Sequence, residues 1–287
     1  MNSFENHSII ASSVDELVRM GTQHVLDHGD RFTARAGSGL QAYGTAYALE
    51  DGSARLHTLR APQSTTYLAR ELYAYFRGSL AVEDGLAQAA PFWRTLCDSN
   101  GHINSNYGYY VFRKPTEDGG TQLDWVRDCF KKNPDTRKAF IGINGIEHKT
   151  PTLDFPCTVG MLFNMRRGRM NCEVMSRSTD VITGLPYDIG FFSLVNELVA
   201  GLVSVDLGEE VLPGYTAMRT AFTQIYDKTA GKIEQIMDGE IDFQNQRMPA
   251  ITHPEATLDD IVHIDDAVTP QTETVLWVCR QAGLEIV

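Results

Sequence analysis

Cysteine pairs with metal-ligand spacing are absent from this sequence. Its 287 residues include five cysteines, an odd number, and no two of them form a CxxC motif. Neither a zinc ribbon nor a thioredoxin-like redox motif is therefore supported, and no metal is expected. Free thiols are typical of a reducing compartment, so we expect a cytoplasmic protein.

Positive charge is scarce as well. Lysine and arginine number 25 against 37 aspartates and glutamates, which gives a formal net charge of −12. An acidic chain has no general affinity for polyanions, so nucleic acid is not an expected partner. Any phosphate group must instead be bound by a local cluster of basic side chains.

A leader segment and a membrane span are also not evident. The N-terminus, MNSFENHSII, lacks a basic region followed by an apolar core, so no signal peptide is expected. The longest apolar run, IGFFSLVNELVAGLVSV, contains Asn196 and Glu197 and is short for a membrane span. This run is better explained as a buried helix.

The residues that are present indicate a globular protein with both helices and strands. Hydrophobic residues make up 43% and charged residues 22% of the chain, enough to form a substantial core. Ser13 opens a capping-box pattern before an amphipathic segment, Gly78 is expected to stop a second helix, and a third is expected over 122–132. No repeat, low-complexity tract or linker is evident, so we expect one α+β domain over residues 1–287.

Strands are expected between these helices. The pattern predicts a strand on each side of a turn at residues 50–52, a strand near Lys138 and a hairpin around residues 167–169. Further helices are predicted from about Ile189 and from the region of Met218.

One cysteine has a setting that suits a nucleophile. Cys157 follows a proline in DFPCTV, and a lone cysteine is most often a small core residue. A nucleophilic cysteine needs nearby cations or a partner base to favour the thiolate. Arg177 and other arginines lie close in sequence, and His148 offers an alternative Cys–His pair of the hydrolase type, although no flanking signature supports it.

Three basic elements are candidates for binding a phosphate. Arg35 opens the glycine-rich RAGSG, Arg137 and Lys138 lie in PDTRK, and Arg177 precedes a hydroxyl at Ser178 in RSTD. Each alone is as easily a solvated charged segment. Three together favour phosphate binding, because guanidinium groups and hydroxyls are common phosphate donors.

Two acids stand where the pattern predicts burial. Glu71 lies in the apolar helix pattern LARELYAYF, and Asp188 lies in LPYDIGFF beside a proline and a glycine. Buried carboxyls are either paired structurally or held at a site with a raised pKa. Trp93 and Tyr107 flank CDSNGHINS, where aromatic side chains more often pack than bind ligands.

Taken in order, these segments resemble thymidylate synthases and the related pyrimidine hydroxymethylases. The resemblance runs from about residue 35 to residue 226, and its motifs are RAGSG, RELYAYFRG, FWRTLCDSNGHINSNYG, NPDTRK, FPC, RSTD, GLPYDIGFF and QIY. The spacing is similar too: Arg137 and Arg177 each lie 20 residues from Cys157, and Asp188 follows Cys157 by 31. The resemblance implies a single thymidylate-synthase-like domain with a mixed, bent β-sheet flanked by helices.

The same resemblance implies a folate-dependent reaction on a pyrimidine nucleotide. Cys157 would match the nucleophile that adds to C6 of the base, Glu71 the acid that organises water and proton transfers, and Tyr107 a tyrosine near the nucleophile. Carbon C5 would then capture a one-carbon unit from 5,10-methylenetetrahydrofolate, the expected co-substrate. A synthase reduces the resulting exocyclic methylene group with hydride, whereas a hydroxymethylase adds water.

Phosphate-binding roles are implied in the same way. Arg35, Arg177 and Ser178 would match phosphate ligands from the same subunit. Arg137 and Lys138 would match a pair that reaches the phosphate site of the other subunit in a homodimer. Further matches are Trp93 and Asp180 at folate-contacting positions and Tyr226 at a sugar-contacting position.

The residue that distinguishes the base is Asp188. Synthases normally have Asn at the matching position, and its amide can donate to O4 and accept from N3–H of uracil. Cytosine reverses both polarities. An aspartate accepts from the 4-amino group, provided that either N3 or the acid itself carries the shared proton. We therefore expect a cytidylate substrate and, since known cytidylate relatives are hydroxymethylases, addition of water.

Three positions depart from the synthase pattern. Thr158 stands where synthases usually have His, Lys138 replaces the second arginine of the partner-supplied pair, and Gln224 replaces a sugar-contacting His. The last two changes suggest altered sugar recognition, so we expect CMP rather than dCMP. This combination is similar to the hydroxymethylases of mildiomycin-type nucleoside-antibiotic pathways.

Other functions stay open at this stage. They are a dCMP hydroxymethylase, a thymidylate-synthase-type methylase, a Cys–His hydrolase that uses His148, and a non-catalytic nucleotide-binding protein. The C-terminal GLEIV would match the family's tail, which closes over the site.

Overall fold

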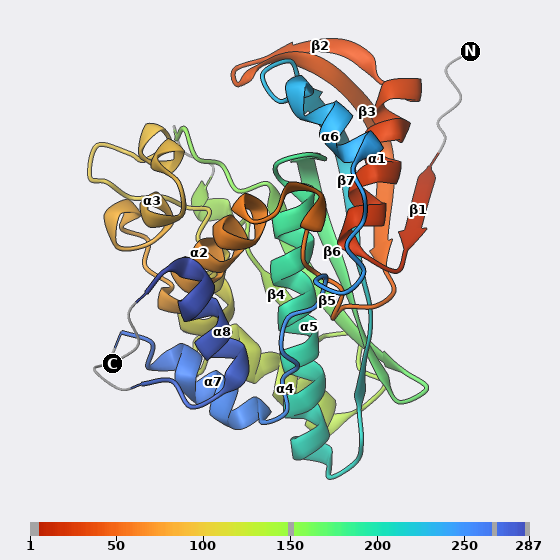
Figure 1. Ribbon diagram of the computed structural model, residues 1–287. Coiled ribbons are helices and arrows are strands. Elements are labelled where there is room, and N and C mark those ends of the chain that lie inside the picture. The colour runs from red at the N-terminus through yellow and green to blue at the C-terminus, as the bar shows by residue number, and fades with distance from the viewer. Residues whose placement is uncertain (1–5, 149–151, 266–268, 285–287) are drawn as a thin grey trace.

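The fold is organised around one sheet whose strands run in both directions (Figure 1). The computed structural model describes residues 6–148, 152–265 and 269–284, so the end of the expected closing tail, residues 285–287, lies outside the described residues. The strand order is β1-β3-β7-β6-β5-β4, with β2 paired to β3. The strands are β1 (His7–Ala11), β2 (Asp30–Ala34), β3 (Gly37–Leu49), β4 (Phe140–Gly142), β5 (Thr158–Arg166), β6 (Arg169–Asp180) and β7 (Leu212–Tyr226). The pairs β1–β3 and β6–β7 are parallel and the others antiparallel.

Helices cover one face of this sheet. The longest is α5 (Leu185–Leu207), which packs against β6 and β7. By length and composition it could cross a membrane, but 72% of its apolar window is buried within the protein, as expected of a core helix. The other helices are α1 (Val14–His28), α2 (Gln63–Arg77), α3 (Leu86–Ala89), α4 (Gln122–Lys132), α6 (Ile233–Asp238), α7 (Pro254–Val262) and α8 (Glu273–Ala282). The expected α+β arrangement, a mixed sheet flanked by helices, is confirmed.

Several predicted element ends are also confirmed. Ser13 caps α1, because its hydroxyl accepts a hydrogen bond from the Glu16 amide. Gly78 ends α2 in the left-handed conformation, with φ of 62°. The β5–β6 hairpin turns at Arg167 and Gly168, whose φ values of 53° and 68° are both positive, as a two-residue hairpin loop requires.

The helix predicted from the region of Met218 is wrong. Met218 lies near the middle of β7, a strand of 15 residues. This strand pairs with β3 on one side and with β6 on the other, so both neighbours satisfy its backbone groups. Its β-branched residues, such as Thr216 and Thr220, also suit a strand. The helix expected from about Ile189 begins earlier, at Leu185, which places Asp188 in its first turn.

The strand predicted after the turn at residues 50–52 is also wrong. That segment continues without a strand to a short 3₁₀ helix, Thr58–Arg60. Its polar side chains bind two helices instead: buried Arg55 forms an ion pair with Glu197 of α5, and His57 contacts Asp15 of α1 at 2.8 Å.

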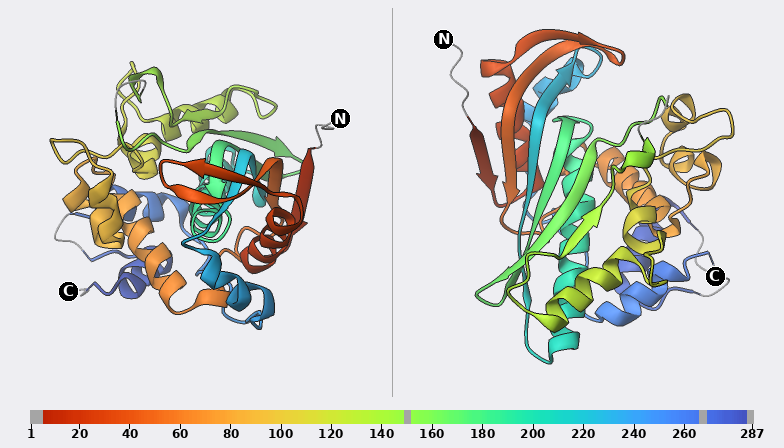
Figure 2. Two further views of the ribbon diagram at one scale, coloured as in Figure 1. Left: turned by 90° about the horizontal axis from the view of Figure 1, so that it is seen from above. Right: turned by 180° about the vertical axis from the view of Figure 1, so that it is seen from behind.

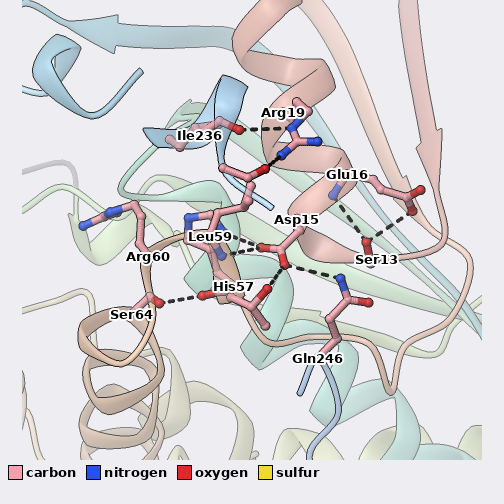
Figure 3. Close-up of polar contacts among 12 residues, drawn as sticks. Ser13, Asp15, Glu16, Arg19, His57, Leu59, Arg60, Ser64, Ile236 and Gln246 are labelled. Atoms are coloured by element: carbon pink, nitrogen blue, oxygen red, sulfur yellow. Dashed lines mark hydrogen bonds and ion pairs between the residues drawn. The ribbon is translucent and has the colours of Figure 1, made fainter. Parts of the chain in front are cut away.

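The Asp15 carboxylate is the centre of this second contact (Figure 3). It accepts hydrogen bonds from the Leu59 amide at 3.3 Å and the Gln246 side chain at 3.3 Å, and from the Thr58 hydroxyl. Burial alone would raise the pKa of Asp15, but the hydrogen bonds from His57 and Thr58 outweigh it and lower that pKa. A segment anchored by such contacts is not free to extend as a strand.

Candidate active site

The topology brings several chain segments to one end of the sheet. Because β6 and β7 are parallel, Asp180 and Gln224 near their C-terminal ends are neighbours. Strand β3 runs antiparallel to β7, so its N-terminal end, preceded by Arg35, lies beside Tyr226. Strand β5 starts at the same end, immediately after Cys157. Most of the predicted site residues therefore converge, although they are spread over nearly 200 positions.

Backbone contacts to β6 hold Cys157 in place. The Arg177 amide donates to the Cys157 carbonyl at 2.9 Å, and the Ser176 hydroxyl donates to the same oxygen at 3.0 Å. The Ser178 hydroxyl approaches the Cys157 sulfur at 3.6 Å. Burial raises the pKa of the thiol, whereas the Arg177 guanidinium and the Ser178 hydrogen bond oppose the rise. The cation and hydroxyl that a thiolate requires are therefore both in place.

Two guanidinium groups lie around the loop that precedes Cys157. Arg177 donates to the Phe155 carbonyl at 2.7 Å and to the Ser178 hydroxyl at 3.1 Å, and Arg35 donates to the Leu153 carbonyl at 2.6 Å. Both arginine residues are largely exposed, so the guanidinium groups are oriented by the backbone and still accessible to an anion.

Tyr226 belongs to the same group of residues. Burial raises the pKa of its phenol, and Asp180 and Cys157 raise it further. The charges of Arg177 and Arg35 act in the opposite direction. A side chain influenced by these four residues lies among them.

Two acids meet where helices α2 and α5 pack together. Burial, assisted by the nearby Asp188 carboxyl, raises the pKa of Glu71 to about 8. Burial likewise raises the pKa of Asp188 to about 7. The helices approach closely at Gly190, where a Cβ atom would lie 3.0 Å from Leu68. Both carboxyls therefore keep their protons to higher pH than ordinary acids do, a property of groups that transfer protons.

Aromatic side chains surround these acids. Tyr107 is buried, stacks between Tyr75 and Phe192, and lies close enough for Asp188 and Cys157 to raise its pKa further after burial. Half-buried Trp93 lies on the α2 side of the site, next to the Tyr67 hydroxyl.

Asp180 and Gln224 form hydrogen bonds to neighbouring residues of the protein. One oxygen of Asp180 accepts from the amides of Ile182 and Thr183, at 2.8 and 2.7 Å, which shapes the turn leading into α5. Gln224 is buried, and its side-chain amide donates to Oε1 of the Gln41 side chain at 3.1 Å. Both residues lie at the site end of the sheet.

Arg137 and Lys138 are not part of this cluster. They lie in the loop between α4 and β4, and both are exposed. Arg137 lines a separate cavity of about 470 Å³ whose other lining residues are Pro134, Asp135, Thr136, Asn164, Met165 and Arg166. The structure brings together the residues predicted to act in one subunit, and not the two predicted to act on the other.

The arrangement does not favour a Cys157–His148 pair. His148 is buried, its Nε2 lies 2.8 Å from the Tyr110 hydroxyl and its Nδ1 accepts from the Gly145 amide at 3.1 Å. Both ring nitrogens of His148 therefore contact groups other than the Cys157 sulfur. His148 is not positioned as the general base that a Cys–His hydrolase needs.

Two residues of this region were missed by sequence reasoning. Asp154 is buried and accepts from the Asn104 and Ser105 amides at 2.6 and 2.7 Å, which fastens the Cys157 loop to the segment before Tyr107. Tyr67 donates to Glu71 at 3.0 Å. Asp154 stands three residues before Cys157 and Tyr67 four residues before Glu71, so spacing was an available signal for both.

A thiol, two carboxyls with raised pKa values and exposed guanidinium groups therefore lie together at one end of the mixed sheet of an α+β protein. The model of the thymidylate synthase family matches residues 19–266. The chain therefore belongs to the thymidylate synthase family, whose members transfer a one-carbon unit from methylenetetrahydrofolate to a pyrimidine nucleotide. This protein is a folate-dependent one-carbon transferase of that kind.

A second cavity lies beside helix α2. A cavity of about 340 Å³ is lined by Pro62, Gln63, Thr66, Tyr67, Arg70 and Ala89. Tyr67 is the aromatic residue of this lining, and the Arg70 guanidinium donates to the Ala282 carbonyl at 3.2 Å. Among the described residues, no group of three or more His, Cys, Asp or Glu side chains could hold a metal ion.

Proposed function

We propose that this enzyme is a cytidylate 5-hydroxymethylase that converts CMP to 5-hydroxymethyl-CMP. The observation that carries the proposal is Asp188, a carboxyl with a pKa of about 7 in the first turn of α5, beside Glu71. Near neutral pH such an acid is partly protonated. It can then donate to N3 of cytosine and accept from the 4-amino group, so that both polar edges of the base are matched.

The residues around Cys157 support the first chemical steps. Arg35, Arg177 and Ser178 bind the phosphate and place C6 of the base against the sulfur. The Cys157 thiolate, favoured by Arg177, then forms a bond to C6 and makes C5 nucleophilic. The co-substrate supplies the one-carbon unit that C5 receives. Glu71 is placed to remove the proton from the water that completes the reaction.

The sugar preference is supported by Gln224. Its side-chain amide donates to Gln41, which fixes the orientation of the group. Its carbonyl oxygen makes no hydrogen bond to another described residue, so it is left to accept from a sugar hydroxyl. Together with Lys138 in place of an arginine, this favours the ribonucleotide CMP, with dCMP as the alternative.

A homodimer is supported by the uncovered face of the sheet. Seen from behind, the strands lie in front of α5 (Figure 2, right). Large apolar side chains are exposed on six strands of the sheet, among them Ile10 on β1, Tyr43 on β3, Phe140 on β4, Val159 on β5, Met175 on β6 and Tyr215 on β7. In a dimer that buries them, the family resemblance implies that Arg137 and Lys138 reach the partner's phosphate site. We therefore propose a homodimer with sites completed across the interface, working in the cytoplasm.

The decisive experiment compares nucleotides. CMP, dCMP, UMP and dUMP labelled with tritium at C5 are each incubated with methylenetetrahydrofolate, and tritium release and product mass are measured. We expect the fastest release from CMP and a product heavier by CH₂O. Faster release from dUMP with a methylated product would overturn the proposal in favour of a synthase.

A substitution at Asp188, the residue proposed to select the base, gives a second test. In Asp188→Asn the amide can match uracil, so kcat/KM for the uracil nucleotide relative to CMP should rise about 100-fold or more, as expected when buried hydrogen bonds are mismatched. Cys157→Ala should bind CMP and give no product, which separates an enzyme from a non-catalytic nucleotide-binding protein. An unchanged base preference in Asp188→Asn would show that another residue selects the base.

A further inference from the structure

Tyr67 lies between the two helices that carry the acids. It precedes Glu71 by four residues on α2, so both side chains are on the same face of the helix. Its hydroxyl donates to Oε1 of Glu71 at 3.0 Å. Its ring packs against that of Tyr187 on α5, with centroids 4.4 Å apart, and Tyr187 is the immediate neighbour of Asp188.

The same tyrosine lines the cavity on the α2 side. Of the residues that form this cavity of about 340 Å³, Tyr67 is the one that hydrogen-bonds Glu71. It is only partly buried. The Tyr67 side chain therefore connects the cavity with the carboxyl of Glu71.

This contact determines what the carboxyl of Glu71 can do. Donation from Tyr67 to Oε1 restricts the rotation of the carboxylate, and a second hydrogen bond comes from Tyr75. Each carboxylate oxygen has two lone pairs, so Oε2 retains one that can accept a proton. We propose that Tyr67 is a positioning residue that orients Glu71 as the base for the incoming water and so directs the reaction toward the hydroxymethyl product. This inference rests on the proposed hydroxymethylase function.

The step in which Tyr67 acts can be written in full. The water oxygen bonds to the exocyclic carbon of the nucleotide, and the water proton passes to Oε2 of Glu71. The electron pair of the exocyclic double bond moves into the ring. It then returns to form the C5–C6 double bond and expels the Cys157 thiolate from C6. If the base for water is misplaced, the exocyclic carbon remains open to other nucleophiles.

The hydrogen bond also affects the pH at which Glu71 acts as a base. The titratable groups that face it are Tyr67 and Tyr75 from α2, and Asp188 and Tyr187 from α5. Burial and Asp188 raise the pKa of Glu71, whereas Tyr67 and Tyr75 lower it. Removing the Tyr67 hydroxyl therefore raises this pKa, and the activity that depends on the carboxylate should appear at higher pH.

The test is Tyr67→Phe in the full-length enzyme, which keeps the ring and removes only the hydroxyl. The protein is supplied with CMP tritiated at C5, methylenetetrahydrofolate and 2-mercaptoethanol, a thiol that competes with water for the exocyclic carbon. Tritium release should stay within about threefold of the wild type, because it precedes the water step. The ratio of hydroxymethyl to thioether product should fall about tenfold, as loss of a hydrogen bond to a charged group gives. The pH midpoint of hydroxymethylation should move up.

Tyr73→Phe is the matched control. It lies on the same helix but is influenced by Arg77, Asp265 and Cys279 rather than by Glu71. Its product ratio should equal that of the wild type. The ratio does not depend on the fraction of folded enzyme, so reduced stability cannot mimic the effect.

The outcomes separate this inference from the function on which it rests. A wild-type enzyme that forms hydroxymethyl product, with the same ratio and pH midpoint in Tyr67→Phe, overturns the role of Tyr67 alone. If Tyr73→Phe changes the product ratio as much as Tyr67→Phe does, the role of Tyr67 is also overturned. A wild-type enzyme that yields only methyl product overturns both.

Discussion

At the scale of single residues, opposing effects act on the sulfur of Cys157. Burial disfavours the thiolate, and the Arg177 guanidinium and the Ser178 hydroxyl favour it. A neighbouring cation offsets a burial penalty because it interacts only with the charged form of the thiol. The reactivity of this cysteine therefore depends on a side chain 20 residues away on the adjacent strand.

Arg177→Ala should accordingly raise the pKa of Cys157. Alkylation of Cys157 by iodoacetamide, followed by peptide mass spectrometry across pH 6 to 10, should show a higher midpoint and, at pH 7, a rate several-fold lower; one full pKa unit corresponds to about tenfold. Arg169→Ala is the control, because Arg169 lies at the far end of β6 and donates to the Pro213 carbonyl. Equal alkylation profiles in all three proteins would refute the electrostatic role of Arg177.

At the scale of elements, the site depends on how closely α2 approaches the segment that carries Tyr107. A Cβ atom on Gly108 would lie 1.8 Å from the Tyr75 carbonyl oxygen, a backbone atom of α2. Neither segment can yield locally, because backbone rather than a flexible side chain occupies the space. Only glycine allows Tyr107 to lie beside Asp188 and Cys157 in this way.

Gly108→Ala should therefore both destabilise the protein and displace Tyr107. Overpacking of this kind costs about 2–3 kcal/mol, which urea denaturation should detect, and turnover should fall with it. Gly231→Ala is the control, since nothing lies within 4 Å of its added Cβ atom and its φ is not in the left-handed range. A Gly108→Ala variant as stable as Gly231→Ala would contradict the close packing.

A histidine cluster joins α1 to the edge strand β1. The ring of His24 stacks on that of His7 with centroids 4.1 Å apart, and His28 lies 4.8 Å from His24. Burial, together with His7 and His28, lowers the pKa of His24 to about 4, and Asp27 acts in the opposite direction. The folded protein thus keeps His24 neutral over a pH range in which the unfolded chain would protonate it.

Stability should therefore fall as the pH drops from about 6.5 toward 4. In that window the unfolded state binds a proton at His24 that the folded state does not, and protonation favours unfolding. Thermal melts at pH 7 and pH 5 should show a smaller difference in Tm for His24→Gln than for the wild type. His102→Gln is the control, because His102 is exposed, and its difference in Tm between pH 7 and pH 5 should equal that of the wild type. If His24→Gln also shows the wild-type difference in Tm, the histidine cluster does not cause the loss of stability at low pH.

At the scale of the whole molecule, the uncovered sheet face carries both apolar and charged groups. Met175 and Tyr215 are 44% and 36% exposed there, and beside them Glu173 pairs with Arg219 at 2.9 Å. An exposed apolar face of this kind commonly marks an interface. The proposed dimer would bury it and complete each phosphate site with Arg137 and Lys138 of the partner.

Met175→Glu should dissociate the dimer and reduce activity together. Size-exclusion chromatography with light scattering should give a mass near that of one chain, and KM for CMP should rise as the partner's cations are lost. Met20→Glu is the matched control, because Met20 is similarly exposed, at 46%, but lies on α1. A wild-type protein that elutes as an active monomer would refute the dimer.

Much of the fold could be predicted from the sequence where local signals agree with tertiary contacts. The Ser13 cap, the Gly78 stop and the hairpin at residues 167–168 each depend on a few neighbouring residues, and each is confirmed. The Met218 helix is wrong because pairing partners far along the chain, in β3 and β6, decide the conformation of that segment. The strand predicted before Thr58 is wrong for the same reason, since the residues that hold this segment, Glu197 and Asp15, lie far away in sequence.

Less of the candidate site could be predicted from the sequence. Ordered motifs identified Cys157, Asp188 and Arg177 as members of one site, and the structure brings them together, while their catalytic roles stay predictions. The contact of Tyr67 with Glu71 has the spacing of a helical pair, but many such pairs are inert. Only the packing of α2 against α5 distinguishes this one.

The sequence by itself determined the chemical groups: a thiol, two carboxyls, several guanidinium groups, and their order along the chain, which is enough to recognise the family. The tertiary structure decided their properties. The pKa values of Asp188 and Glu71 depend on burial between two helices more than 100 residues apart in sequence, and the reactivity of Cys157 depends on a cation from the next strand. Solvation and distance set these energies, and both exist only once the chain has folded.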